Sequence, residues 1–317
     1  MSGTRKPVVI VAGPTASGKS ALALAIAREF DGVVINADSM QVYAELRLLT
    51  ARPTPEDEAM VPHRLYGVMS ATEACSAGRW RDMALAEIGR AHEAGKLPVV
   101  CGGTGLYIRA LTEGLSPMPE APDKIRMALR ERLSREGAAA LHRDLERRDP
   151  AMAGRLNPAD GQRIVRALEV LEGTGRSLAD WQSDPPAGAP DDLQFLTILL
   201  EPPRRWLYDR CDRRLAAMIE AGALDEVRRL TAMGLDPGLP AMKALGVGHL
   251  AEYLAGNREL ADALASAQQA TRNYAKRQMT WFRNQIVADK IIAEQFSESL
   301  QTEIFSFIRH FLLTLAD

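Results

Sequence analysis

The sequence predicts an α/β protein with a P-loop NTPase-like parallel sheet flanked by helices and a helical insertion domain. Three observations support this prediction. A phosphate-binding motif follows the first apolar strand, β-branched runs then alternate with helical segments to residue 105, and two proline-rich segments enclose an arginine-rich helical stretch. Alternating strands and helices are typical of a parallel sheet with helices on both faces. In such sheets the ligand site lies at the carboxyl ends of the strands.

The phosphate-binding motif lies near the start of the chain. An apolar run at residues 8–11 precedes it, and an amphipathic helix with Leu22 and Ile26 on one face follows it. In this context the pattern G-x-x-x-x-G-K-[ST] indicates a P-loop, made here of Gly13, Pro14, Thr15, Ala16, Ser17, Gly18, Lys19 and Ser20. Its backbone N–H groups and the helix dipole would hold a diphosphate or a longer phosphate chain. Lys19 supplies a positive charge, and Ser20 offers a hydroxyl to Mg²⁺.

Hydrophobic periodicity and the positions of glycine and proline predict the other elements. We expect strands at residues 32–38, 97–103 and 193–201. We expect helices at 76–95, 205–220, 224–233, 239–254, with an interruption at ALGVG (244–248), and 257–289. Residues 1–114 and 193–290 form the expected P-loop core with a helical C-terminal part, residues 115–192 the helical insertion domain, and residues 291–317 a C-terminal helical tail.

Composition limits the functional classes. With 317 residues, 46% of them hydrophobic, the chain can bury a substantial core, and its net charge of −2 gives no global sign of nucleic-acid binding. Basic residues gather locally instead, with twelve against eight acids in residues 124–176 and five against one in residues 272–290. Three scattered cysteines, no signal sequence and no apolar run of membrane-spanning length favour a soluble, cytoplasmic protein without disulfides or a zinc site.

Asp38 follows the second expected strand and has three interpretations. It could bind Mg²⁺ as in P-loop NTPases, act as a general base or hydrogen-bond acceptor for an incoming nucleophile, or cap a turn or a helix. The GGTG segment at residues 102–105 is equally ambiguous. Its glycines permit close backbone approach and Thr104 could direct a hydroxyl to a leaving oxygen, but a tight turn before a helix fits as well.

Two basic segments could contact phosphate or RNA. Five arginines lie within residues 204–214, where a guanidinium fork would suit diphosphate and a solvated helix face is the default. Residues 276–284, KRQMTWFRN, interleave basic and aromatic side chains. Such side chains can neutralise phosphates and stack on bases, although an amphipathic helix with core aromatics gives the same pattern.

Seven segments occur in an order that resembles one family. They are GPTASGKS, INADSMQVY, TARP (50–53), Pro62-His63, GGTGLYIRAL, QRIVRALEV (162–170) and KRQMTWFRN. Together they resemble the tRNA dimethylallyltransferase (tRNA isopentenyltransferase, IPP transferase) family over residues 7–285, and the combination is far more specific than any one segment. The resemblance implies transfer of a dimethylallyl group from dimethylallyl diphosphate to the exocyclic N6 of the adenosine directly 3′ of the tRNA anticodon.

The resemblance also implies roles for particular residues. Asp38 would be the base, and the loop, Lys19, Thr104, Arg214 and a Mg²⁺ ion on Ser20 would stabilise the leaving diphosphate. The implied contacts to the tRNA anticodon stem-loop are Asp38, Ser39, Met40, Gln41, Thr104, Arg126, Gln162, Arg163, Arg166, Lys276, Arg277, Gln278, Trp281 and Arg283. The implied partners are thus tRNA and dimethylallyl diphosphate, without a membrane, and we expect a monomer.

Three other functions fit part of the pattern. A small-molecule or nucleotide kinase would hold ATP in the loop with Asp38 on Mg²⁺. An adenylate isopentenyltransferase would prenylate free nucleotide, but a mononucleotide needs neither the long insertion nor the segment at 276–284. An RNA-binding regulator with an inactive P-loop would not need the intact Lys19 and Ser20.

Overall fold

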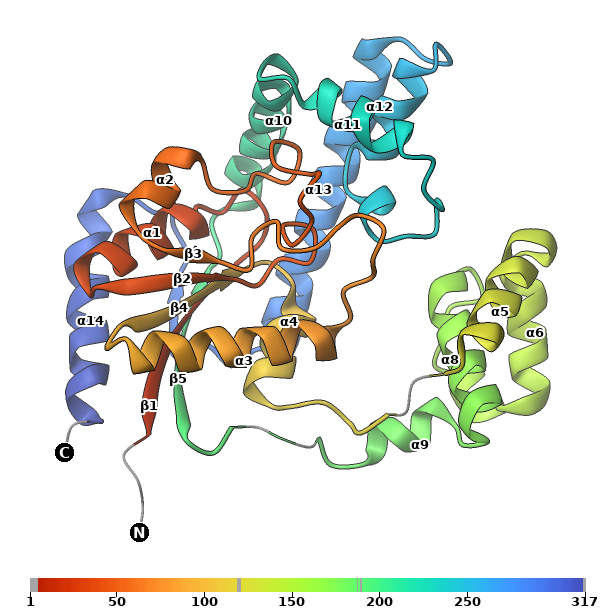
Figure 1. The fold of residues 1–317 in the computed structure, drawn as a ribbon, viewed down its shortest axis with the longest axis horizontal. Coiled ribbons are helices and arrows are strands. Elements are labelled where there is room, and N and C mark those ends of the chain that lie inside the picture. Colours follow the sequence, from red (N-terminus) through yellow and green to blue (C-terminus); the bar gives the residue numbers. More distant parts are fainter. Residues whose placement is uncertain (1–4, 119–120, 187, 189, 316–317) are drawn as a thin grey trace. The chain divides into compact units, whose positions relative to one another are not determined.

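A six-stranded parallel sheet forms the centre of the larger part of the chain, which confirms the predicted fold class (Figure 1). The computed structural model describes residues 5–118, 121–186, 188 and 190–315. The strand order is β3-β2-β4-β1-β5-β6. The strands are β1 Lys6–Ala12, β2 Gly32–Asn36, β3 His63–Arg64, β4 Leu97–Gly102, β5 Leu193–Leu200 and β6 Lys290–Ile292.

Helices cover both faces of this sheet. The helices of this part of the chain are α1 Lys19–Glu29, α2 Pro55–Met60, α3 Ala77–Glu93, α4 Gly105–Thr112, α10 Arg204–Glu220, α11 Ala223–Ala232, α12 Val247–Leu254, α13 Leu260–Gln285 and α14 Gln301–Thr314, with short 3₁₀ helices at Ala241–Lys243 and Glu298–Leu300. None of the helices in the described ranges is long and apolar enough to cross a bilayer.

The central strand explains why the sheet is buried on both faces. Residues 8–12 of β1 are apolar and fully buried, as expected for a strand between two layers of helices. Because successive side chains point to opposite faces, Val8 and Ile10 face a core shared with α3 and α4, whereas Val9 and Val11 face one shared with α1 and α14. Figure 1 shows α3 on one side of the sheet and α1 with α14 on the other.

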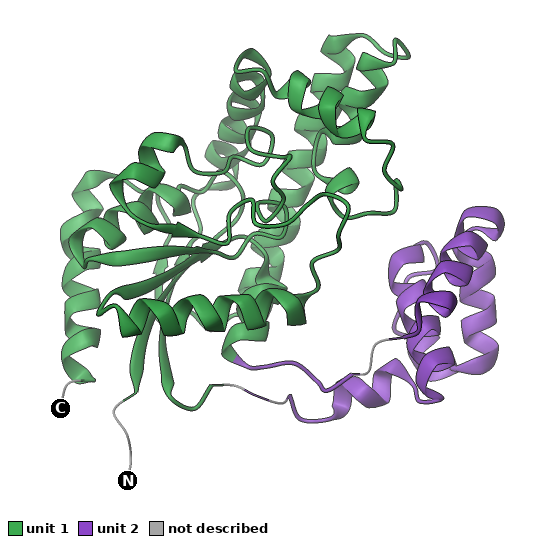
Figure 2. Cartoon of the chain, in the orientation of Figure 1, with its two compact units in different colours: residues 1–112, 190–317 green, residues 113–189 purple. Residues whose placement is uncertain are grey.

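Residues 113–189 form a second compact unit, drawn in purple in Figure 2. Its helices are α5 Asp123–Glu136, α6 Ala138–Arg148, α7 Pro150–Ala153, α8 Gly161–Thr174 and α9 Leu178–Ser183. These helices have their own core, in which Leu129, Leu141, Ile164 and Leu168 are almost or fully buried. The remaining residues, 1–112 and 190–317, cluster as the unit that contains the sheet.

The structure differs from the sequence-based prediction at both edges of the sheet. β3 and β6 were not expected, because strands of two or three residues carry too little periodicity to detect. α13 ends at Gln285, and the chain then adds β6 beside β5, pairing Ile198 with Lys290 and Leu200 with Ile292. The expected helical tail therefore begins with sheet residues. The second strand also ends at Asn36, two residues earlier than expected.

Candidate functional site

Three loops meet at the carboxyl edge of the sheet, as the strand pattern predicts. They are the P-loop at residues 13–18 and the segments at 37–41 and 103–104, which follow β1, β2 and β4. These three strands are neighbours in the sheet, with β4 in the middle. The Thr104 N–H donates to the carbonyl oxygen of Ala37 at 3.2 Å, which joins two of the loops directly.

The P-loop turns tightly around its two glycines. A Cβ atom on Gly13 would lie 2.8 Å from Ser17 Oγ and 3.0 Å from the carbonyl oxygen of Leu200, so no side chain fits there. Gly18 precedes α1 with φ of 99°, a conformation that favours glycine. The Ser17 hydroxyl is fully buried and has no hydrogen-bond partner among the described residues. A bound oxyanion would satisfy such a group.

Two basic side chains converge on this loop. Lys19 Nζ donates to the carbonyl oxygen of Pro14 at 3.3 Å, and the Arg214 guanidinium, from α10, donates to the hydroxyl of Thr15. Burial lowers the pKa of both basic side chains, and the charge of Asp38 opposes this effect in each case. Because burial disfavours an isolated cation, both groups favour an anion bound beside them.

Asp38 is half-buried and its backbone is fixed by Asn36. Asn36 Oδ1 accepts the Asp38 N–H at 2.8 Å, and Asn36 Nδ2 donates to the Asp38 carbonyl at 3.0 Å. Asp38 Oδ1 accepts the N–H of Met40 at 2.9 Å. This oxygen therefore caps a turn, as one of the three interpretations predicts. Oδ2 accepts no hydrogen bond from the described residues, which leaves it available to a ligand.

Thr104 and Gln41 hold the surrounding loops. Thr104 Oγ1 accepts the Ser39 N–H at 2.9 Å and donates to Ser39 Oγ at 3.2 Å. Gln41 Nε2 donates to the carbonyl oxygens of Thr50 and Ala51, both at 2.8 Å. Thr104 therefore links the loops after β2 and β4, whereas Gln41 ties the loop after β2 to residues 50–51.

The glycines of the GGTG segment each lie against another part of the chain. A Cβ atom on Gly102 would lie 2.1 Å from the backbone of Ala37, and one on Gly103 would lie 2.5 Å from Gln278 Nε2. A Cβ atom on Gly105 would lie 2.0 Å from the ring of Trp281. These glycines let a neighbouring loop and α13 pack directly on the backbone of the segment.

The predicted RNA-facing residues of α13 separate into two sets. Lys276 and Arg277 are exposed, and Arg283 is exposed and hydrogen-bonded to Glu201. Trp281 is half-buried over Gly105, whereas Gln278 is only 6% exposed. The prediction that Gln278 contacts tRNA needs correction, because its side chain faces the interior and both of its amide groups are hydrogen-bonded there.

Sequence reasoning missed two tyrosines near Asp38. Burial raises the pKa of Tyr66 and of Tyr274, and the negative charge of Asp38 acts in the same direction. Both phenols therefore keep their protons at neutral pH and can donate hydrogen bonds. Neither belongs to a recognisable pattern, since they come from a loop and from α13, more than two hundred residues apart. No sequence signal could have placed them at this site.

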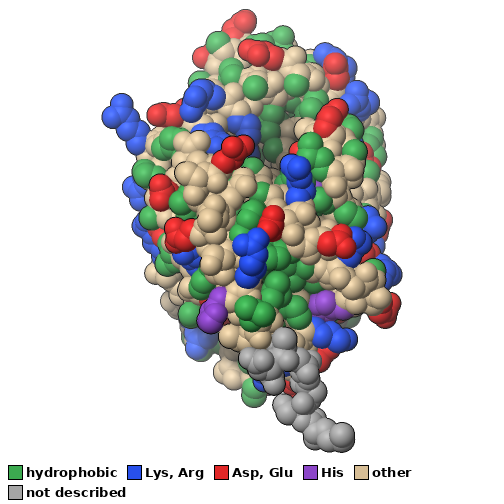
Figure 3. Space-filling model, turned by 90° about the vertical axis from the view of Figure 1, so that its left-hand side faces the viewer, with side chains coloured by type: hydrophobic (Ala, Val, Ile, Leu, Met, Phe, Trp, Pro, Cys, Tyr) green, Lys and Arg blue, Asp and Glu red, His purple; other side chains and the backbone are tan. Residues whose placement is uncertain are grey.

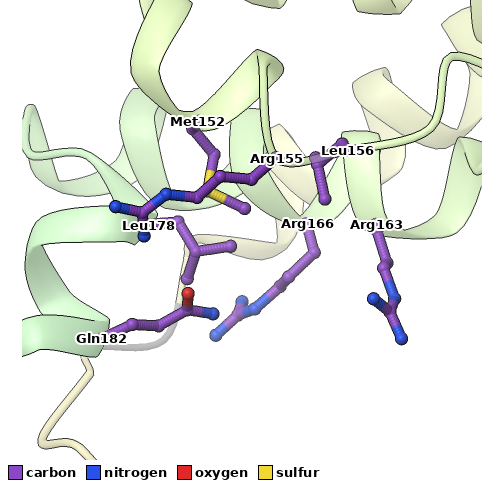
Figure 4. Close-up of a pocket in the computed structure, with 7 residues that line it drawn as sticks. All are labelled: Met152, Arg155, Leu156, Arg163, Arg166, Leu178 and Gln182. Carbon is purple, nitrogen blue, oxygen red and sulfur yellow. The ribbon is translucent and has the colours of Figure 1, made fainter.

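The helical unit contains a cavity of about 290 Å³. Figure 4 shows the residues that line it, which are Met152, Arg155, Leu156, Arg163, Arg166, Leu178 and Gln182. Arg163 lies 3.4 Å from Asp160, and Arg166 donates to Met118 Sδ at 3.2 Å. Arg155, which sequence reasoning missed, forms no ion pair or side-chain hydrogen bond with the described residues.

The other predicted residues of this unit lie on its surface. Gln162 is exposed beside Arg163 at the start of α8. Arg126 is half-buried and pairs with Asp123 at 3.3 Å. Of the arginines at the cavity, Arg155 and Arg163 are exposed and thus accessible to a polyanion. Acidic and basic side chains are interspersed over the face of the molecule that Figure 3 shows.

The P-loop side chains fit a divalent metal that is held jointly with a diphosphate. Across the described part of the chain, no group of three or more His, Cys, Asp and Glu side chains could hold a metal alone. Mg²⁺ usually takes one or two protein oxygens together with substrate phosphates and water. The exposed Ser20 hydroxyl, in the first turn of α1, is a donor of this kind.

The fold and the site define a class: a P-loop α/β protein whose glycine-rich loop lies beside a carboxylate and a basic helix. A model of the IPP transferase family matches residues 41–285, and a model described as isopentenyl transferase matches residues 6–74. The chain belongs to the IPP transferase family.

Relatives of this chain cover nearly its whole length. The tRNA dimethylallyltransferase of Paramagnetospirillum magneticum is 56% identical over 99% of both chains, and that of Rhodospirillum rubrum is 54% identical over 97% of this chain and 96% of the relative. The crystal structure of the full-length tRNA isopentenylpyrophosphate transferase from Bacillus halodurans is 33% identical, with a TM-score of 0.71 over 98% of each chain. A eukaryotic dimethylallyltransferase acting on tRNA is 27% identical, with a TM-score of 0.72 over 87% of this chain and 70% of its own.

Proposed function

We propose that this chain is a tRNA dimethylallyltransferase that uses dimethylallyl diphosphate to prenylate N6 of the adenosine directly 3′ of the anticodon. Its membership of the IPP transferase family supports the reaction class. The observation that carries the mechanism is the position of Asp38, which follows β2 at the same edge of the sheet as the P-loop and half-buried Lys19. The transfer needs a base for the acceptor amine and donors for the leaving diphosphate. In our proposal the free oxygen of Asp38 is the base and the P-loop supplies the donors.

The P-loop acts on the leaving group. When the allylic C–O bond breaks, its electron pair passes to the diphosphate, and negative charge accumulates there. In our proposal the donors there are Lys19, the Ser17 hydroxyl and the loop N–H groups other than those of Thr15 and Ser17, which already donate within the protein. Arg214 donates to the Thr15 hydroxyl. Preorganised donors of this kind are each worth about 10²- to 10³-fold in rate.

Asp38 acts on the acceptor. The lone pair of the adenine N6 is delocalised into the ring, so N6 becomes a useful nucleophile only as it loses a proton. In our proposal N6 bonds to the allylic carbon and its proton passes to Asp38 Oδ2, while Oδ1 stays on the Met40 N–H. Thr104 Oγ1 donates its hydrogen to Ser39 Oγ and accepts the Ser39 N–H, so in our proposal it turns its hydrogen from Ser39 Oγ to the departing oxygen.

Mg²⁺ is the divalent ion that we propose, with Ser20 as its protein ligand. When bound, it supplies positive charge to the diphosphate oxygens. Lys19 and Arg214, both half-buried, supply the rest of the charge from the protein, and their partial removal from water strengthens these interactions. The proposal assigns no other metal ligand.

RNA binding is assigned to two sets of residues. On the sheet-containing unit they are residues 38–41, Thr104 and the exposed α13 side chains Lys276 and Arg277. On the helical unit they are Arg126, Gln162 and the arginines of the cavity. We propose that both sets contact the anticodon stem-loop, because phosphate contacts of this kind position an RNA while a base is turned out of its stack. A cytoplasmic location, consistent with three free cysteines, completes the proposal.

One experiment tests the function. The protein is incubated with labelled dimethylallyl diphosphate and Mg²⁺ together with bulk tRNA, AMP or ATP. We expect label in tRNA only, at the adenosine beside the anticodon, and no turnover after chelation of the metal. Label in AMP would identify a free-nucleotide enzyme, and phosphoryl transfer from ATP without prenyl transfer would identify a kinase.

A further inference from the structure

Gln278 is the one long polar side chain on the buried face of α13. The other buried residues of this helix are Ala263, Ala267, Thr271, Ala275, Met279 and Phe282. Thr271 satisfies its own hydroxyl by donating to the carbonyl of Ala267 at 2.8 Å. A buried amide has two donors and an acceptor that must find partners, so the surroundings of Gln278 decide whether its burial is favourable.

Both functional groups of this amide are hydrogen-bonded to the catalytic loops. Gln278 Oε1 accepts the N–H of Thr15 in the P-loop at 2.8 Å, and Nε2 donates to the carbonyl oxygen of Gly103 at 2.7 Å. Nε2 also occupies the space that a Cβ atom on Gly103 would fill, at 2.5 Å. A single planar group therefore joins the loop after β1 to the loop after β4, and the glycine at 103 makes room for it.

A second helix holds the same P-loop residue from its other side. The Arg214 guanidinium donates to the Thr15 hydroxyl, while Gln278 accepts the Thr15 N–H. The helices that carry these two side chains are joined by an ion pair in which Arg272 lies 2.6 Å from Asp212. The conformation of the P-loop at Thr15 is thus determined by α10 and α13 together.

From this geometry we infer that Gln278 is a positioning residue for the diphosphate site, although it lies within the run of residues that carries the basic RNA-facing side chains. It acts through Thr15 and Gly103, which it holds at a fixed spacing, and touches neither substrate itself. The inference rests on the proposed function. It predicts that residues two positions apart on α13 control different substrates: Lys276 the RNA and Gln278 the diphosphate.

The test compares three variants in binding and in steady-state transfer. Gln278→Met keeps the size of the side chain and removes both hydrogen bonds. Its affinity for inorganic diphosphate with Mg²⁺, measured by calorimetry, is expected to fall about tenfold or more, since each lost bond leaves a buried backbone group unpaired. Its KM for dimethylallyl diphosphate rises in parallel, while its tRNA affinity stays within about twofold. Lys276→Ala is expected to show the reverse pattern.

Gln278→Glu provides a second readout, the pH dependence of diphosphate affinity, which a merely structural role of Gln278 would not change. As a carboxylate, the introduced group still accepts the Thr15 N–H but places a second oxygen against the Gly103 carbonyl. When protonated, it can both accept and donate as the amide does. Burial raises the pKa of such a carboxyl, so the diphosphate affinity of this variant, relative to the unsubstituted chain, is expected to recover as pH falls.

The outcomes separate the inference from the proposed function. If the unsubstituted chain transfers no prenyl group to tRNA, the proposed function fails. If it does so, but Gln278→Met binds diphosphate as the unsubstituted chain does, or loses tRNA affinity instead, the positioning role is overturned. Should Gln278→Met fail to fold, as urea unfolding would show, Gln278→Glu still decides the question: an affinity ratio that does not change with pH contradicts the inference.

Discussion

Thr104 and Ser39 are joined by two hydrogen bonds, from the Ser39 N–H to Thr104 Oγ1 at 2.9 Å and from Thr104 Oγ1 to Ser39 Oγ at 3.2 Å. The first of these residues follows β4 and the second follows β2, and the strands are adjacent in the sheet. This pair keeps the loop that carries Asp38 at a fixed distance from the loop assigned to the leaving group.

Replacement of Asp38 is expected to stop the chemistry and spare RNA binding. Asp38→Asn keeps an acceptor for the Met40 N–H but removes the base, so we expect the single-turnover rate to fall about 10²- to 10⁴-fold. The tRNA affinity should remain within about tenfold, a loss near 1.4 kcal/mol. Asp262→Asn, an exposed change in the first turn of α13, is the control and should leave the rate unchanged. A fully active Asp38→Asn enzyme contradicts the assignment.

The pH dependence of diphosphate binding follows from Lys19. Burial lowers the pKa of this side chain below that of an exposed lysine, which is about 10.4. Lys19 therefore loses its charge as pH rises through the lowered value, and diphosphate affinity should fall at a pH where other lysines are still protonated. Calorimetric titration with inorganic diphosphate and Mg²⁺ between about pH 7 and pH 10 measures this.

Lys19→Arg is the control for that titration, because arginine stays charged throughout. Coinciding pH curves for the two proteins would contradict the prediction. Stability without ligand changes in the opposite direction. Between the folded and the unfolded pKa of Lys19, the unfolded chain binds more protons than the folded chain. The contribution of Lys19 to the free energy of unfolding therefore rises with pH.

Arg155 in the cavity of the helical unit is expected to contribute one RNA phosphate contact. Affinity for tRNA should fall steeply with salt, and Arg155→Ala should reduce the slope of log K against log salt by about one. Arg147→Ala removes an exposed arginine of the same unit that pairs with Asp144 and does not line the cavity. Equal slopes for the two variants would exclude the cavity from the interface.

Gly105 is expected to tolerate no side chain while Trp281 is present. A Cβ atom there would lie 2.0 Å from the Trp281 ring, so Gly105→Ala should lower the free energy of urea-induced unfolding by about 1–3 kcal/mol. The double variant with Trp281→Leu should lose less than the sum of the single changes. Gly89→Ala is the matched control: nothing lies within 4 Å of a Cβ there, in the middle of α3, and stability should rise by about 0.5–1 kcal/mol.

Local patterns in the sequence predict the fold and the P-loop well. The run at residues 8–11, the glycines at 13 and 18 and the helix after Ser20 encode β1, the loop and α1 within thirty contiguous residues. The order of strands and helices through residue 112 likewise predicts a parallel sheet with the site at its carboxyl edge. Edge strands of two or three residues escape such patterns, because so short a segment carries too little periodicity.

The site as a whole needs contacts between distant segments. Thr15 and Gln278 are 263 residues apart, and Arg214 and Thr15 are 199 apart. The periodicity of the helix does not predict that Gln278 points inward while Lys276 and Arg277 point outward. All three are polar residues, and a polar residue is expected on the exposed face of an amphipathic helix. Tyr66 and Tyr274 were missed for a similar reason, because only the folded structure brings both tyrosines close enough to Asp38 for its charge to act on them.

The last thirty residues have a consequence for attempts to shorten this protein. The family match ends at residue 285, yet β6 pairs with the edge of β5, and Ile304 and Ile308 of α14 pack with the core beneath α1. A chain stopped at residue 285 would leave β5 as an open strand prone to intermolecular pairing and would expose the apolar side of the helix that starts at the P-loop. The smallest recombinant fragment with an intact P-loop core therefore extends well past residue 285, where the family match ends.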